Sequence, residues 1–450
     1  MQAFEYIQIV TDQIRCKKAR SFIAEELSQH IDDQMDRYIA DGLGPKEAEA
    51  AAVKEMGDPV SIGTDLDRIH RPKIDWKMVL LIALLTLTGL AVQFVSADFG
   101  RDSWFLQQVL YTVLGLGVMI LIYFADYTLL GKRPILMWLS WSALLVGLIH
   151  TSVGHMKWII AGQHRYYPLI TLLIPLFAGI LYRFRGTSYA GFFCCGGFAA
   201  SGLMLCLLNH TMSALVKLML IFAAMMTYAV SKGWFKINKL TGYLTIYGSI
   251  GSVATAHLSY YLLRPLNEYN YKSLRLKAAL HPEKYANGEG YFSMQIRELL
   301  NNTKWIGSAG NNFSFILAED SYIFASDTML IYIFATFGLL AGMALLLVLY
   351  AAIARVLMGA MQQKNQLGSM VSFGCGCFFL TETVIYVMYN LGFTLFSPTY
   401  LPFFSKSGTG IIVMYALMGL VLSVYRNTNI IKEKSAGTIP KYRIRIKRIL

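Results

Sequence analysis

Long apolar runs alternate with short polar connections over most of the chain. From Trp76 onward, about ten runs approach the ~20 residues that one helical crossing of a bilayer requires. They centre on residues 77–97, 104–124, 134–153, 167–182, 188–208, 211–231, 241–262, 328–354, 368–389 and 408–425. Because backbone hydrogen bonds must be satisfied internally in lipid, each run predicts a helix. The pattern predicts an all-α polytopic membrane protein of about ten transmembrane helices.

The first 75 residues follow a different pattern. Apolar residues recur there at helical spacing, as Ile23, Leu27, Ile31, Met35 and Ile39. A second helix is expected over "GLGPKEAEAAAVKEMGDP", with Pro45 near its start and Gly57 at its end. We therefore expect a small soluble helical domain at 1–75, a transmembrane domain at 76–427 and a basic tail at 428–450.

Composition supports this division. Hydrophobic residues make up 55% of the chain and charged residues only 15%, with a mean hydropathy of +0.47. A chain of this length with those values is too apolar for an ordinary soluble protein. The polar start contains no short apolar core with a cleavage site, so no secretory signal peptide is expected. The six cysteines fit small membrane-core residues better than disulfides or metal ligands.

Basic residues in the short connections predict the orientation. They fall in alternate loops, as Lys132, Arg133, Arg183, Arg185, Lys232, Lys236, Lys239, Arg355 and Lys364. Lys and Arg collect in cytoplasmic loops, so both termini are expected in the cytoplasm and the long loop 263–327 outside it. The tail is expected to bind anionic lipid headgroups, at about 1 kcal/mol per charge. That interpretation is favoured over nucleic-acid binding.

Four stretches, in order, resemble one family. Three of them are "GHMKWIIAG" (154–162), "LRLKAALHPEKYANGEGYFSMQ" (274–295) and "NLGFTLFSPTYLPFFSKSGTG" (390–410). The fourth begins with Ser326 and Asp327, and Asp327 lies eleven residues before Gly338. The chain thereby resembles the SEDS proteins (shape, elongation, division and sporulation; FtsW, RodA and SpoVE) over roughly residues 77–427. The head resembles the permease-prefix domains that precede various bacterial membrane proteins.

The resemblance implies a peptidoglycan glycosyltransferase of the bacterial plasma membrane. Such enzymes polymerise lipid II, an undecaprenyl-pyrophosphate-linked disaccharide, and usually act with a class B penicillin-binding protein in cell shape, division or sporulation. Asp327 matches the essential acid of the family. The chain departs from the family pattern in three places: "YYPLI" (166–170) replaces the usual Gln-Pro-Ser-Glu, Ala335 and Thr336 replace paired acids, and "SKSGTG" (405–410) replaces Gly-Gly-Ser-Ser.

The chemistry can also be argued from the residues. Displacing a diphosphate with a sugar hydroxyl requires a base and positive charge near the leaving group. A carboxylate at a low-dielectric boundary has a raised proton affinity, which suits Asp327 to the role of base. The candidate diphosphate-binding cations are Lys157, Arg165, Arg275 and Lys277, and Trp158 is a candidate for the substrate groove. A divalent cation, Mg²⁺ or Mn²⁺, bridging Asp327 and the diphosphate is compatible with this chemistry, and no other cofactor is expected.

Each assignment has an alternative. Asp327 at a helix N-terminus is also stabilised as a simple cap, by about 0.3 to 1 kcal/mol. Trp158 is also typical of an interface aromatic, and Arg275 and Lys277 of contacts with outer-leaflet phosphates. Two functions from different classes therefore stay open. One is a glycosyltransferase with Asp327 as base; the other is a non-catalytic scaffold or lipid-precursor-handling (flippase-like) protein.

Overall fold

The computed structural model describes residues 1–96, 104–155, 167–208, 211–263, 271–308, 327–396, 400–405 and 407–430. The chain is 80% helical, and the described ranges contain no strand. It divides into two compact units. Of the described residues, unit 1 comprises 1–75, 363–365 and 424–430, and unit 2 comprises those within Trp76–Gln362 and Gln366–Ser423. The predicted all-α class is confirmed.

Unit 1 contains four helices. They are α1 (Ala3–Asp12), α2 (Lys17–Ala40), α3 (Pro45–Glu55) and α4 (Pro59–His70). The two helices expected from the sequence correspond to α2 and α3, and Pro45 begins α3 because its fixed φ suits the first turn. Ile23, Leu27 and Ile31 lie in the core, as their spacing predicted. Ile39, the last residue of the same periodic series, lies in the last turn of α2 and is 42% exposed.

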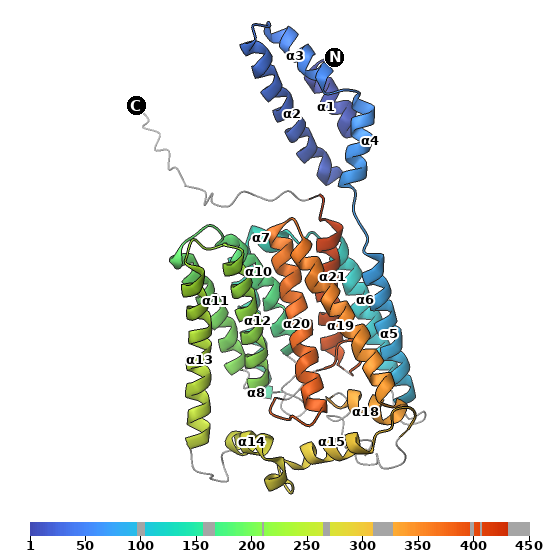
Figure 1. Ribbon diagram of the computed structural model, residues 1–450, viewed down its shortest axis with the longest axis vertical. Coiled ribbons are helices and arrows are strands. Elements are labelled where there is room, and N and C mark those ends of the chain that lie inside the picture. The colour runs from blue at the N-terminus through green and yellow to red at the C-terminus, as the bar shows by residue number, and fades with distance from the viewer. Residues whose placement is uncertain are drawn as a thin grey trace. The chain divides into compact units, whose positions relative to one another are not determined.

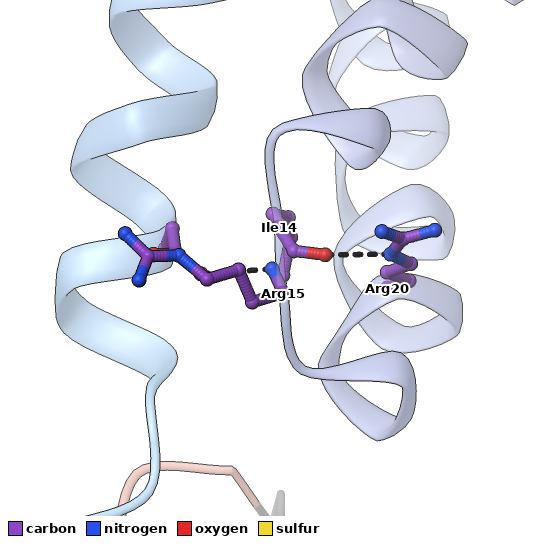
Figure 2. Close-up of polar contacts among 4 residues, drawn as sticks. Ile14, Arg15 and Arg20 are labelled. Atoms are coloured by element: carbon purple, nitrogen blue, oxygen red, sulfur yellow. Dashed lines mark hydrogen bonds and ion pairs between the residues drawn. The ribbon is translucent and has the colours of Figure 1, made fainter.

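A polar corner joins α1, α2 and α4 (Figure 2). The Nε of Arg20 donates to the carbonyl of Ile14 at 2.6 Å. The backbone N–H of Arg15 donates to Oδ1 of Asp67 at 2.9 Å, and its Nε lies 3.3 Å from Oδ2. Asp67 is almost fully buried, so these bonds offset the cost of burying its charge.

The chain segment after the last helix also belongs to unit 1. Ile430 is 5% exposed and lies in the same apolar core as Tyr6 and Ile14. Nδ2 of Asn429 donates to the carbonyl of Ile69 at 3.1 Å. The sequence assigned Asn429 and Ile430 to the basic tail, whereas in the structure they complete the head.

Unit 2 contains the membrane helices (Figure 1). Its bundle helices are α5 (Trp76–Ser96), α6 (Trp104–Phe124), α7 (Leu129–Lys132), α8 (Pro134–His155), α9 (Tyr167–Thr171), α10 (Leu173–Arg183), α11 (Tyr189–Leu208), α12 (Met212–Ser231), α13 (Lys239–Leu263), α18 (Met329–Phe337), α19 (Leu339–Gln362), α20 (Gln366–Asn390) and α21 (Gly408–Arg426). Among the described residues, seven helices are long and apolar enough to cross a membrane, and two shorter apolar helices accompany them. Nine of the ten predicted runs coincide with these nine helices, and the remaining run, 241–262, coincides with α13. The protein is therefore a polytopic membrane protein, as predicted.

One predicted helix is broken. The run 328–354 was expected to be continuous, but α18 ends at Phe337 and α19 begins at Leu339. Gly338 between them has φ +95°, which L side chains rarely adopt, and a Cβ there would lie 2.7 Å from the carbonyl of Trp305. That carbonyl accepts the N–H of Leu340 at 3.1 Å. The turn at Trp305, in the loop before α18, is therefore hydrogen-bonded to the first turn of α19.

Three further helical segments cross one end of the bundle, the end at which α18 lies (Figure 1). They are α14 (Tyr271–Leu280), the 3₁₀ turn η2 (Pro282–Tyr285) and α15 (Tyr291–Asn302). α14 packs mainly against α13 and η2, and α15 packs against η2 and α18. In the centre, α20 packs against α10, α12, α18 and α19. The acid at the start of α18 is therefore placed between α20 and the loop helix α15.

Candidate functional site

Asp327 stands at the beginning of the α18 segment, and its side chain is partly buried. The next residue, Thr328, is 1% exposed, and α18 begins at Met329. The Thr328 side chain does not cap the helix. The first N–H groups of α18 therefore need partners from elsewhere, because a helix leaves its first turn unbonded.

Asn390, the last residue of α20, supplies one set of these bonds. Its Nδ2 donates to the backbone carbonyl of Asp327 at 2.9 Å, and its Oδ1 accepts the N–H of Ile331 at 3.2 Å. The same Nδ2 donates to the carbonyl of Tyr386 at 3.0 Å. Asn390 is fully buried, so one amide side chain fixes the backbone on both sides of the α18 start.

Tyr386 lies one turn earlier on α20 and supplies a further bond. Its hydroxyl accepts the N–H of Met329 at 2.9 Å and the hydroxyl of Ser405 at 3.3 Å. Ser405 in turn accepts the N–H of Leu401 at 2.7 Å. The Asp327 carboxylate interacts electrostatically with Tyr386. Residues of the "NLG" and "LPFFS" stretches thus hold the acid's backbone in place.

The loop helix α15 packs onto the same region. Ile296 and Leu299 share an apolar cluster with Ile331 of α18 and Tyr389 of α20. Ser293 donates to the carbonyl of Gly392, just beyond the end of α20. The loop before α18 is therefore anchored within two residues of Asn390.

The other predicted site residues lie either on α14 or outside the described residues. Lys157, Trp158 and Arg165 lie outside the described residues. Arg275 and Lys277 lie on α14, both partly buried. The helix α14 packs mainly on α13 and η2. Their roles stay predictions.

Sequence analysis missed one cation at this site and one in the bundle. Arg297 of α15 lies against Gly392, and its guanidinium carbon lies 5.9 Å from the centre of the Phe393 ring. Lys217 of α12 forms a buried ion pair with Glu382 of α20, with 3.0 Å between Nζ and Oε2. The signal for Lys217 was available, since a basic residue inside an apolar run requires a partner.

No three His, Cys, Asp or Glu side chains converge in the described part of the chain in a way that suits a metal ion. A cation at Asp327 would have this one carboxylate and substrate phosphates as ligands. Phosphates with one or two carboxylates are a common Mg²⁺ environment, so the residues present are compatible with it.

Comparison with known proteins decides the family. The cell cycle protein family FtsW/RodA/SpoVE matches residues 73–430. The chain belongs to this family. Its membrane unit is thus a SEDS fold, and residues 1–72 lie outside the match.

Individual SEDS proteins are similar to the chain at low identity. The probable peptidoglycan glycosyltransferase FtsW of Enterococcus hirae is 24% identical over 389 residues, which is 81% of this chain and 94% of that protein. A solved structure on the structural coordination of polymerization and crosslinking by a peptidoglycan synthase complex matches with a TM-score of 0.61 and 16% identity, over 79% of this chain and 98% of that one. The Thermus thermophilus rod shape determining protein RodA matches with a TM-score of 0.53 and 15% identity, over 79% and 97%. These structures share the fold.

Proposed function

We propose that this protein is a peptidoglycan glycosyltransferase that polymerises lipid II at the outer face of the bacterial plasma membrane, with Asp327 as general base. Family membership supports a role in cell-wall synthesis, and the similarity to FtsW of Enterococcus hirae supports a glycosyltransferase. The observation that carries the proposal is the set of hydrogen bonds that fixes the backbone around Asp327. Asn390 and Tyr386 fix the backbone around it, while its carboxylate stays partly exposed.

A fixed and partly exposed carboxylate suits proton abstraction. In the proposed step, Asp327 accepts the proton of the acceptor sugar hydroxyl. The hydroxyl oxygen then bonds to the anomeric carbon of the donor sugar, and the bond from that carbon to the diphosphate breaks. The diphosphate leaves on its lipid with the electron pair. General-base assistance contributes about 100- to 10,000-fold in rate.

The leaving diphosphate needs positive charge. Arg275 and Lys277 on α14 are partly exposed cations of the loop. Lys157 belongs to the stretch 154–162 that is similar to the family segment, and Arg165 follows that stretch. We include all four as diphosphate-binding residues and Trp158 as a groove residue. A divalent cation would supply charge neutralisation between Asp327 and the diphosphate.

The orientation follows the distribution of basic residues. Both termini are proposed to be cytoplasmic, which places α14, α15 and Asp327 on the outer side, where lipid II would be available. The synthase complex among the similar structures supports a class B penicillin-binding protein as partner. The basic tail is proposed to contact anionic lipids.

A non-catalytic scaffold is the second candidate, and Ile170 is the observation that favours it. SEDS proteins generally carry Gln-Pro-Ser-Glu where this chain has "YPLI" at 167–170, so Ile170 stands at the position of the acid. Its side chain is fully buried. A second carboxylate is therefore absent at this point of the described bundle.

The deciding experiment uses the purified protein in lipid nanodiscs with labelled lipid II. The wild type is expected to make glycan polymer, and Asp327→Asn is expected to lower the rate at least 100-fold while its thermal unfolding is unchanged. Glu283→Gln, an exposed acid on η2, serves as the matched control and should keep full activity. If Asp327→Asn is as active as the wild type, Asp327 is not the base; if both proteins are inert, the catalytic proposal fails and the scaffold is favoured.

A further inference from the structure

The strongest unassigned feature beside the candidate site is the guanidinium of Arg297. α15 places it at the end of α20, against Gly392. Gly392 follows Asn390 by two residues, and Asn390 holds the carbonyl of Asp327. The cation and the acid are thus fixed to the same short stretch of backbone.

The position of Arg297 is built into the fold. A Cβ at Gly392 would lie 2.9 Å from Cγ of Arg297, and Gly392 has φ +90°, so only glycine leaves room for the arginine stem. On the buried face of the same helix, Ile296 and Leu299 pack against α18 and α20. The anchored helix therefore determines where the guanidinium lies.

The charge of Arg297 is not neutralised by the described protein. Its recorded contact there is the ring of Phe393, which is 50% exposed. Lys217, the fully buried cation of the bundle, has the Glu382 carboxylate as its partner. A partly buried cation without a counter-charge is costly unless a ligand supplies the negative charge.

We propose that Arg297 binds the diphosphate of the lipid-linked sugar at the Asp327 site. A planar guanidinium can donate paired hydrogen bonds to phosphate oxygens, and a contact with an aromatic ring such as that of Phe393 does not use its N–H groups. This inference rests on the proposed function for the identity of the ligand, but it concerns binding and not turnover. Arg297 was not among the cations that sequence analysis selected.

The test measures binding without reaction. Full-length protein in nanodiscs of uncharged lipid is titrated with undecaprenyl diphosphate, and binding is followed by thermal stabilisation. Arg297→Gln is expected to weaken binding by about 10- to 100-fold, the effect of losing a charge-assisted pair of bonds. Arg297→Lys keeps the charge and should lose less. Lys284→Gln, which removes an exposed cation from η2, should bind as the wild type does.

Two further arms identify the source of the phosphate. Nanodiscs containing phosphatidylglycerol, and inorganic pyrophosphate in solution, are each compared between wild type and Arg297→Gln. The proposal expects little dependence on Arg297 for phosphatidylglycerol, whereas inorganic pyrophosphate should bind more weakly than the lipid diphosphate but with the same dependence on Arg297. If the binding of phosphatidylglycerol depends equally on Arg297, the proposal is overturned in favour of a general headgroup site. It is also overturned if Arg297→Gln and Arg297→Lys bind undecaprenyl diphosphate as tightly as the wild type, or if the wild type does not bind it.

The outcomes separate this inference from the proposed function. A protein that binds undecaprenyl diphosphate through Arg297 but makes no glycan from lipid II would contradict the glycosyltransferase and leave the binding site standing. Asp327→Asn should retain diphosphate binding while losing polymerisation.

Discussion

Lys217 and Glu382 form an ion pair inside the membrane unit, with 3.0 Å between Nζ and Oε2 and each side chain 1% exposed. They join α12 to α20, the helix that also carries Tyr386 and Asn390. Glu382, Tyr386 and Asn390 follow one another at intervals of four residues, so they lie along one face of α20. The pair therefore fixes, through α20, the same face that holds the Asp327 backbone.

Removing one partner of this pair should destabilise the protein strongly. Lys217→Met leaves the Glu382 carboxylate buried without its counter-charge, and we expect a loss of about 3 to 5 kcal/mol. The double variant Lys217→Met with Glu382→Met removes both charges and should recover most of that loss. Thermal unfolding in detergent, followed by size-exclusion fluorescence, measures both. A double variant as unstable as the single one would contradict this account.

The hydrogen bond from Asn390 to the backbone of Asp327 can be tested by measuring the polymerisation rate. Asn390→Leu keeps the volume but leaves the Asp327 carbonyl and the Ile331 N–H without partners, at about 1 to 3 kcal/mol for each buried group. If Asp327 is the base, its misplacement should lower the polymerisation rate on lipid II while leaving the KM nearly unchanged. Asn302→Ala, at the exposed end of α15, is the matched control. Equal rates for wild type and Asn390→Leu would show that the cap does not position the acid.

The membrane helices could be predicted from the sequence because each apolar run determines its own helix in lipid. The helix α20 was expected at 368–389 and spans Gln366–Asn390. The start of α18 was also expected near Asp327. What failed was the continuity of the run after it, because the break at Gly338 depends on a loop turn at Trp305 that docks there.

The contacts of the site could not be predicted in the same way. Glu382 lies in an apolar run, where a charge is costly, and its partner Lys217 lies 165 residues earlier. The two are brought together only by the packing of α12 on α20. Arg297 sits on an amphipathic loop helix whose periodicity predicts a helix but not what it packs against. Its position became evident only from the contacts of α15 with Gly392.

The break between α18 and α19 should depend on its glycine. Gly338→Ala forces a Cβ into a backbone with φ +95° and against the Trp305 carbonyl, so we expect a loss of about 1 to 3 kcal/mol. Gly359→Ala, inside α19 with open space around its Cβ position, should be neutral or slightly stabilising. Thermal unfolding of the two variants under one condition gives the comparison. Equal destabilisation would indicate a general intolerance of α19 to alanine.

The packing of Ile430 into the head gives a prediction that needs no enzymatic assay. Ile430 is 5% exposed in the core of unit 1, and Ile430→Ala should destabilise that unit by about 2 kcal/mol or more. Hydrogen exchange of the α1 and α2 amides in the full-length protein reports the loss, because protected amides exchange through unfolding of the unit. Ile39→Ala, at a residue 42% exposed on α2, is the matched control and should change protection by less than about 0.5 kcal/mol.

If Ile430→Ala leaves the exchange of α1 and α2 unaltered, the segment after α21 is not part of the folded head. Deletion of residues 1–70 would then expose no new apolar surface on the remaining chain. If protection falls, that deletion must be combined with Ile430→Ser before its effect on polymerisation is interpreted, since an exposed Ile430 promotes association on its own.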